Sequence, residues 1–179
     1  DIRLAFKNLP KEFQDDVSED LIKKLLIRKK DLPKYASQYY HLLNQKVILT
    51  GTDKKDRFVI TRLPNNETEI KIIRLKKSGE ELQSSKLYSG KITKEILLYG
   101  LDDDDEFLVE GNEKSTIKLS LLGGLDNDKY SISNSKKVKI FDYKTKKNDF
   151  ENKGNSRLIL TDDYDINQYN YRNPKYNVF

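Results

Sequence analysis

The spacing of hydrophobic positions changes near residue 46. Before this point, apolar residues such as Leu21, Ile22 and Leu25 recur at the spacing of one helix face. After it, short runs rich in β-branched and aromatic residues are separated by Gly, Asn, Asp and Lys, as in strands and turns. The pattern predicts three segments: a helical segment (residues 1–46), a β-rich repeat domain (residues 47–163) and a tyrosine-rich C-terminal tail leading to a further domain (residues 164–179).

The N-terminal segment carries the signals of two helices. Ser18 is the expected N-cap of the first, with Glu19 and Asp20 in the first turn, where carboxylates interact favourably with the helix dipole. Pro33 is the expected start of the second, because proline is tolerated in the first turn of a helix. We therefore expect a helical hairpin ahead of the β-rich domain.

Strand signals dominate the rest of the chain. The turn signals LPNNET and KKSGEE connect the first strands into a meander. The chain is therefore predicted to be mainly β with N-terminal α-helices. The runs that read as strands are VILTG, RFVITRL, TEIKIIRL, KEILLYG, EFLVEG, TIKLSLLGG, KYSIS, KVKIFDY and RLILT.

One local pattern occurs three times in the β-rich domain. Each copy has Gly at the first place, Asp at the sixth and an aromatic residue at the eighth. Recurrence of a fixed pattern points to stacked units rather than to a single unusual loop. The copies are GTDKKDRFVI from Gly51, GLDDDDEFLV from Gly100 and GGLDNDKYSI from Gly123.

The distance between the last two copies predicts how the units stack. They begin 23 residues apart (123 − 100), and the strands around them recur at the same offset. With KVKIFDY following about twenty residues later, stacking places Leu98, Leu121 and Ile140 in an inward-facing ladder and brings Asp105 close to Asp128. The predicted fold is a β-solenoid-like stack of short strands, with a β-sandwich as the alternative.

The repeated turn resembles the calcium-binding nonapeptide of the repeats-in-toxin family, G-G-x-G-x-D-x-U-x, in which U is a large apolar residue. Gly123, Gly124, Asp128 and Tyr130 give the best match, although Asp126 stands where the family has its third glycine. The resemblance implies bound calcium, and converging carboxylates favour a cation. The alternative is a set of solvated turns whose aspartates bond their own backbone. The candidate metal ligands are Asp103, Asp105, Asp126 and Asp128.

Composition excludes several kinds of chemistry. The 179-residue chain has no cysteine, which removes disulfides and thiolate metal sites. Its single histidine, His41, lies on a predicted helix, and the chain has no nucleophile-elbow or phosphate-loop motif. We therefore expect no catalytic residues, no enzyme and, calcium aside, no cofactor. The lack of methionine and the start at Asp1 indicate a piece of a longer precursor.

The net charge of +5 is compatible with an anionic partner. Lysine pairs such as 23–24, 76–77 and 136–137 are, however, scattered through predicted helices and turns. A solvated surface explains them better than a nucleic-acid site does. The tail DYDINQYNYRNPKYNVF interleaves aromatic residues with Asn and Arg, which suits docking on the domain, glycan contact or the aromatic girdle of a following barrel.

A wider resemblance covers nearly the whole chain. The order of LPKEF, KEILLYGLDDDDEFLVEG, LSLLGGLDNDKYSI, KIFDYKTKKN and YRNPKYNVF is similar to a segment of large cell-envelope proteins of Gram-negative bacteria. In those proteins a calcineurin-like metallophosphoesterase domain precedes the segment, and a surface-antigen-type outer-membrane β-barrel of the assembly-factor superfamily follows it. The resemblance implies a periplasmic or surface-exposed linker module that meets the membrane only through the adjoining barrel.

Three functions stay open on these grounds. The favoured one is a non-catalytic structural linker of an outer-membrane protein, stiffened by calcium through its Gly and Asp turns. The second is a ligand-binding or adhesive module that uses the tyrosines. The third is a regulatory segment of a metallophosphoesterase whose catalytic domain lies outside this chain.

Overall fold

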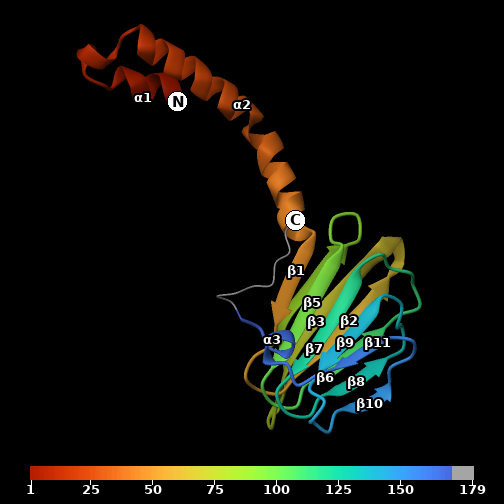
Figure 1. The fold of residues 1–179 in the computed structure, drawn as a ribbon. Coiled ribbons are helices and arrows are strands. Elements are labelled where there is room, and N and C mark those ends of the chain that lie inside the picture. Colours follow the sequence, from red (N-terminus) through yellow and green to blue (C-terminus); the bar gives the residue numbers. More distant parts are fainter. Residues whose placement is uncertain (171–179) are drawn as a thin grey trace. The chain divides into compact units, whose positions relative to one another are not determined.

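A computed structural model describes residues 1–170 of the chain (Figure 1). Two compact units follow one another: residues 1–43 form a helical unit, and the chain from Asn44 onward forms a β-rich unit. The chain is mainly β with helices at its N-terminus, as predicted.

The helical unit has one long helix in place of the predicted hairpin. A short helix α1 (Ile2–Lys7) and a 3₁₀ turn (Lys11–Phe13) precede α2 (Asp16–Asn44), which continues through Pro33. The hairpin prediction is wrong because proline removes one backbone hydrogen bond but does not supply a turn. No Gly or Asn stands beside Pro33 to reverse the chain.

The predicted cap of the long helix is also wrong. The carboxylate of Asp15 accepts a hydrogen bond from the backbone N–H of Ser18 at 3.0 Å, so Asp15 fills the N-cap role. The Ser18 hydroxyl donates instead to the carbonyl of Phe13. Both residue types cap helices well, and the sequence alone does not choose between them.

Two sheets make up the β-rich unit. The five-stranded sheet has the order β1-β5-β7-β9-β11 and is entirely parallel. The six-stranded sheet has the order β10-β8-β6-β2-β3-β4. The strands are β1 (Lys46–Thr50), β2 (Asp56–Leu63), β3 (Glu67–Lys76), β4 (Gly79–Ser89), β5 (Glu95–Leu101), β6 (Glu106–Glu110), β7 (Lys118–Gly124), β8 (Lys129–Ile132), β9 (Val138–Asp142), β10 (Asp149–Asn152) and β11 (Arg157–Leu160).

Consecutive strands from β5 to β11 alternate between the two sheets, so strands one step apart in each sheet run parallel (Figure 1). Glu95 on β5 pairs with Lys118 on β7, and Glu106 on β6 pairs with Lys129 on β8, which confirms the 23-residue step. The first step is longer, because Lys46 pairs with Glu95. The antiparallel strands β3 and β4 are inserted there and account for the 26 additional residues (49 − 23).

The core lies between the sheets and is built from ladders of equivalent residues. Leu98 pairs with Leu121 and Leu121 with Ile140, all three fully buried, so the predicted inward ladder is confirmed. A second ladder stacks aromatic rings with centroid separations of 4.8, 5.1 and 5.3 Å and nearly parallel planes. This aromatic ladder consists of Phe58, Phe107, Tyr130 and Phe150.

Two strands escaped the sequence analysis. β4 lies at the edge of the six-stranded sheet and is almost wholly exposed, so its sequence GEELQSSKLYS lacks the alternation of a half-buried strand. β10, with the sequence DFEN, is short and polar. Both β4 and β10 are strands because they pair with a neighbouring strand, and the intrinsic β-propensity of their residues contributes little.

The described part of the tail docks on the β-rich unit. The tail begins with α3 (Tyr164–Asn167), and the amide of Asn167 donates to the carbonyl of Thr161 at 2.6 Å. The ring of Tyr169 lies 5.2 Å from that of Tyr99. The remaining tail residues, 171–179, lie outside the described residues. Within residues 1–170, no helix combines the length and apolar character needed to span a bilayer.

Candidate functional site

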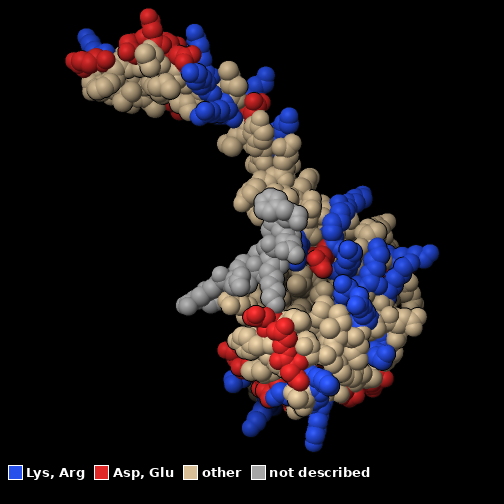
Figure 2. Space-filling model, in the orientation of Figure 1, with Lys and Arg blue, Asp and Glu red and all other residues tan. Residues whose placement is uncertain are grey.

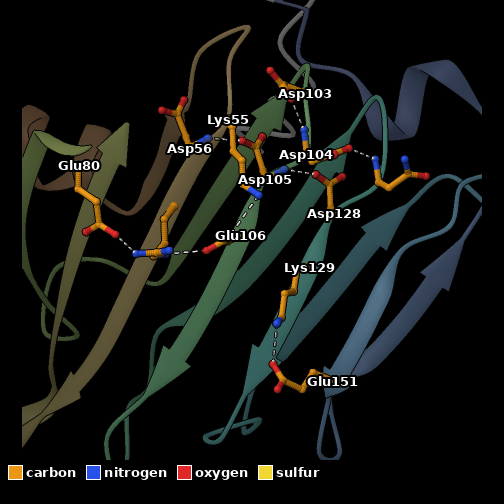
Figure 3. A network of polar contacts seen from close by, with 12 residues as sticks. Lys55, Asp56, Glu80, Asp103, Asp104, Asp105, Glu106, Asp128, Lys129 and Glu151 are labelled. Atoms are coloured by element: carbon orange, nitrogen blue, oxygen red, sulfur yellow. Dashed lines mark hydrogen bonds and ion pairs between the residues drawn. The ribbon is translucent and has the colours of Figure 1, made fainter. Parts of the chain in front are cut away.

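A column of buried carboxylates crosses the start of the six-stranded sheet. Asp56, Asp105 and Asp128 occupy equivalent places on successive steps, and all three side chains are fully buried. Hydrogen bonds join them along the column. The backbone N–H of Asp56 donates to the carboxylate of Asp105 at 2.7 Å, and the backbone N–H of Asp105 donates to the carboxylate of Asp128 at 2.8 Å. The N–H of Asp128 donates to the Asn148 side chain at 2.9 Å. We call these four residues the aspartate ladder (Figure 3).

The glycine at the start of each repeat makes room for this ladder. A Cβ atom at Gly100 would overlap the carboxylate of Asp105, and one at Gly123 would overlap that of Asp128. The two halves of the repeated pattern therefore belong to opposite sheets, and the glycine of one sheet faces the aspartate of the other. This contact explains the spacing of Gly and Asp in the repeat.

The carboxylates of the ladder differ in their partners. Asp56 pairs with Arg74 at 2.9 Å and accepts hydrogen bonds from the backbone and hydroxyl of Thr52, both at 2.7 Å. The second oxygens of Asp105 and Asp128, by contrast, have no hydrogen-bond partner among the described residues. Two buried carboxylates are therefore left without a compensating cation.

Burial dominates the electrostatics of these groups. It raises the pKa of Asp105 to about 9 and that of Asp128 to about 8, and neighbouring aspartates add to both shifts. Burial also raises the pKa of Asp142, at the end of β9, to about 6, although its carboxylate accepts the hydroxyl of Tyr130 at 2.7 Å. Without a bound cation, Asp105 and Asp128 are protonated at neutral pH.

A second set of side chains ties the exposed turns together. The carboxylate of Asp104 accepts the N–H of Asn127 at 3.0 Å, and the side chain of Asn127 accepts the N–H of Lys147 at 2.9 Å. Asp103 and Asp126 sit one place earlier with left-handed backbone angles, φ of 71° and 72°. The aspartate run at 102–105 therefore supplies both an inward ladder and an outward turn ladder.

The four candidate calcium ligands divide into two pairs. Asp105 and Asp128 come together in the buried ladder, whereas Asp126 is exposed and lies 3.7 Å from the ammonium of Lys146. Asp103 accepts the N–H of Asp104 at 2.9 Å. Across residues 1–170, no three His, Cys, Asp or Glu side chains are grouped as a metal site. Calcium binding stays a prediction. Asp105 and Asp128 are the pair whose carboxylates each have an oxygen without a hydrogen-bond partner among the described residues.

The last rung of the ladder was not predicted from the sequence. Asn148 takes the place of aspartate there, and Phe150 continues the aromatic ladder. The signal was present, because an Asp or Asn stands two residues before every ring of that ladder. It was hidden because the glycine place on this rung is held by Asp142.

Comparisons with protein-family models, with characterised proteins and with solved structures give no match. What the chain does is therefore inferred from its own residues and their arrangement.

Proposed function

We propose that the β-rich unit is a non-catalytic structural module, a short β-solenoid that holds its neighbours in a long polypeptide at a fixed separation. The aspartate ladder is the observation that carries this proposal. Its carboxylates are fully buried, and those of Asp105 and Asp128 accept the backbone N–H of the preceding step, so they serve the stacking of strands. A catalytic carboxylate would instead face a cleft that substrate can enter.

The solenoid interpretation rests on the order of the strands. In a solenoid each repeat contacts only its neighbours, so stability builds up from one interface to the next. Here each step from β5 onward contributes one strand to each sheet, and its side chains continue the same ladders. Such a stack resists bending along its axis, a useful property in a spacer.

The proposed setting is the envelope of a Gram-negative bacterium. It follows from the resemblance of the sequence to a segment between a metallophosphoesterase domain and an outer-membrane β-barrel. In this setting the adjoining domains are the partners, nucleic acid is not a partner, and membrane contact occurs only through the barrel.

Fractionation of the source cells tests this setting. The expected result is that an antibody against the chain detects a larger polypeptide in the outer-membrane fraction, accessible to protease on intact or permeabilised cells. Recovery of the chain in the cytosol as a separate small protein would overturn the envelope proposal. Phosphodiesterase assays with and without this segment test the regulatory alternative, since a structural spacer leaves turnover unchanged.

Calcium stiffening is a separate part of the proposal. A ligand that binds only the folded state at about 100 times its dissociation constant stabilises that state by roughly 2.7 kcal/mol. Urea unfolding with calcium, magnesium and a chelator measures this directly. A calcium-specific gain that disappears in Asp128→Asn supports a bound ion, and identical unfolding in all three conditions contradicts it.

A further inference from the structure

A basic cleft of about 270 Å³ lies on the outward face of the five-stranded sheet. Its cationic side chains come from β7, β9, β11 and the turn that leads into β9. All are exposed, whereas Leu119 and Val138 beside them are buried and fix the backbone. The basic cleft is defined by Lys118, Lys137, Lys139 and Arg157.

Strand pairing places these cations side by side. Lys139 and Arg157 are direct partners on adjacent strands, about 4.8 Å apart in the hydrogen-bonding direction. The N–H of Leu119 donates to the carbonyl of Lys137 at 3.0 Å, so Lys137 lies beside the start of β7, where Lys118 stands. Like charges directly opposite one another on a sheet are destabilising, so this row needs a compensating anion.

Cations on the opposite sheet provide a contrast, because several of them are paired with carboxylates. On its outward face Arg57 bonds Glu106 at 2.7 Å, and Lys129 bonds Glu151 at 3.2 Å (Figure 3). In the basic cleft the one acidic side chain is Glu95, the strand partner of Lys118, and its carboxylate lies 3.9 Å from Lys46.

Within residues 1–170, none of the four cations of the cleft has a carboxylate within 4.0 Å. Figure 2 shows a group of basic side chains on one side of the β-rich unit, with an acidic group at its edge, and a mixture of acidic and basic side chains below it. The cleft therefore holds four cations and one carboxylate, which makes it a net positive surface.

Polar groups complete the cleft. Ser120 is the partner of Lys139 on the neighbouring strand, and its side chain is nearly buried between the charged rows. Ser135 and Asn155 close one end, where the N–H of Asn155 donates to the Ser135 hydroxyl at 3.0 Å. Hydroxyls and flexible ammonium groups around a guanidinium fork are donors suited to phosphate oxygens.

We propose that the basic cleft binds a phosphate group, either as a small free phosphate or as part of a lipid headgroup. The volume admits one or two such groups, and the four cations neutralise them. The phosphate site does not depend on the proposed spacer role. A structural spacer that carries this cleft would, in addition, bind an anion or contact an anionic surface.

Calorimetric titration of the whole chain with pyrophosphate tests the free form. Flotation with phosphatidylcholine vesicles, with and without phosphatidylglycerol, tests the lipid form. The test variant is Lys139→Gln with Arg157→Gln. The matched control is Lys55→Gln with Lys129→Gln, which removes the same charge from side chains paired with Glu106 and Glu151 on the other sheet.

The expected result is saturable binding that weakens about tenfold or more in the test variant, since two charged donors to the phosphate oxygens are removed. The control is expected to bind like the parent. Pyrophosphate binding without flotation identifies a free phosphate, and flotation that pyrophosphate competes away identifies a headgroup.

Two results would overturn the proposal. One is the absence of either interaction at physiological ionic strength. The other is equal weakening in the test and control variants, which would mean diffuse attraction to net charge. Unfolding midpoints are compared first, and if the test variant is less stable, Lys118→Gln with Lys137→Gln replaces it.

Discussion

The backbone N–H of Asp105 donates to the carboxylate of Asp128 at 2.8 Å, although 23 residues separate them in the chain. The bond joins the entry to β6 with the entry to β8 and repeats the one between Asp56 and Asp105. It gives each aspartate a backbone donor while leaving a second oxygen buried. The stacking of the unit is thus coupled to the protonation of its carboxylates.

Asp105→Asn tests whether the second carboxylate oxygen of Asp105 lowers the stability of the folded state. The amide keeps an oxygen for the N–H of Asp56 and replaces the unpartnered oxygen with a donor, as Asn148 does on the last rung. We expect the variant to be more stable at neutral pH by about 1–3 kcal/mol in urea unfolding, because the amide is neutral in both states, whereas the Asp105 carboxyl must take up a proton on folding. Asp104→Asn, in the exposed turn, is the control. A clear loss of stability in Asp105→Asn would instead indicate a bound cation.

Stability should fall as the pH rises. The folded pKa values of Asp105 and Asp128, about 9 and about 8, lie far above the unfolded value of about 3.9. The folded state therefore binds more protons than the unfolded state between these limits, and the unfolding free energy decreases with pH there. The contribution is fully present below about pH 4 and is lost as the pH passes through 8 to 9.

Urea unfolding at a series of pH values measures this dependence. The double variant Asp105→Asn with Asp128→Asn should give a flatter curve between pH 4 and 9, since among the acidic side chains of residues 1–170 only Asp142, with a folded pKa of about 6, then contributes in the same direction. Parallel curves for parent and variant would show that the two carboxyls do not titrate as argued.

Gly100→Ala should disrupt the contact between the sheets. The added methyl group overlaps the Asp105 carboxylate and the Gly123 carbonyl, and the loss of stability should be about 1–3 kcal/mol or more. Gly79→Ala is the comparison, because nothing lies within 4 Å of its Cβ and its cost is limited to a strained φ of 132°. Equal losses in calorimetric melting would contradict the packing argument.

The aromatic ladder should respond according to position. Phe107 is fully buried with a stacked ring on either side, and Phe107→Ala should cost about 3–5 kcal/mol. Phe150 is only half-buried at the end of the stack, so Phe150→Ala should cost clearly less. Urea unfolding of the two variants gives the two losses of unfolding free energy. A larger loss for Phe150→Ala than for Phe107→Ala would contradict the central position of Phe107 in the core.

Pro33→Ala tests the continuity of α2. Alanine restores one backbone hydrogen bond and removes the ring clash, worth about 3 kcal/mol in a helix interior. Far-UV circular dichroism should show an unchanged or higher helix content that persists to higher temperature, and Leu32→Ala, at an exposed position, should change little. Lower helicity in Pro33→Ala would favour two separate helices.

Local patterns in the sequence determined the strands and the repeat. Alternation in TEIKIIRL and the Gly-to-Asp spacing of GLDDDDEFLV need only neighbouring residues to be recognised. The 23-residue step followed, and with it the ladder of Leu98, Leu121 and Ile140. These features are local or nearly periodic, so they can be recognised in the sequence alone.

The tertiary structure alone decided the last rung and the partners at the surface. The repeated pattern already makes Asp56 and Asp105 equivalent, but the insertion of β3 and β4 between them, and the hydrogen bond that joins them, depend on strand register and not on distance along the chain. Asn148 joins the ladder, and Lys139 meets Arg157, only when separate strands align. Burial then sets the protonation of Asp105 and Asp128, since a carboxyl shifts its pKa only where folding removes its water.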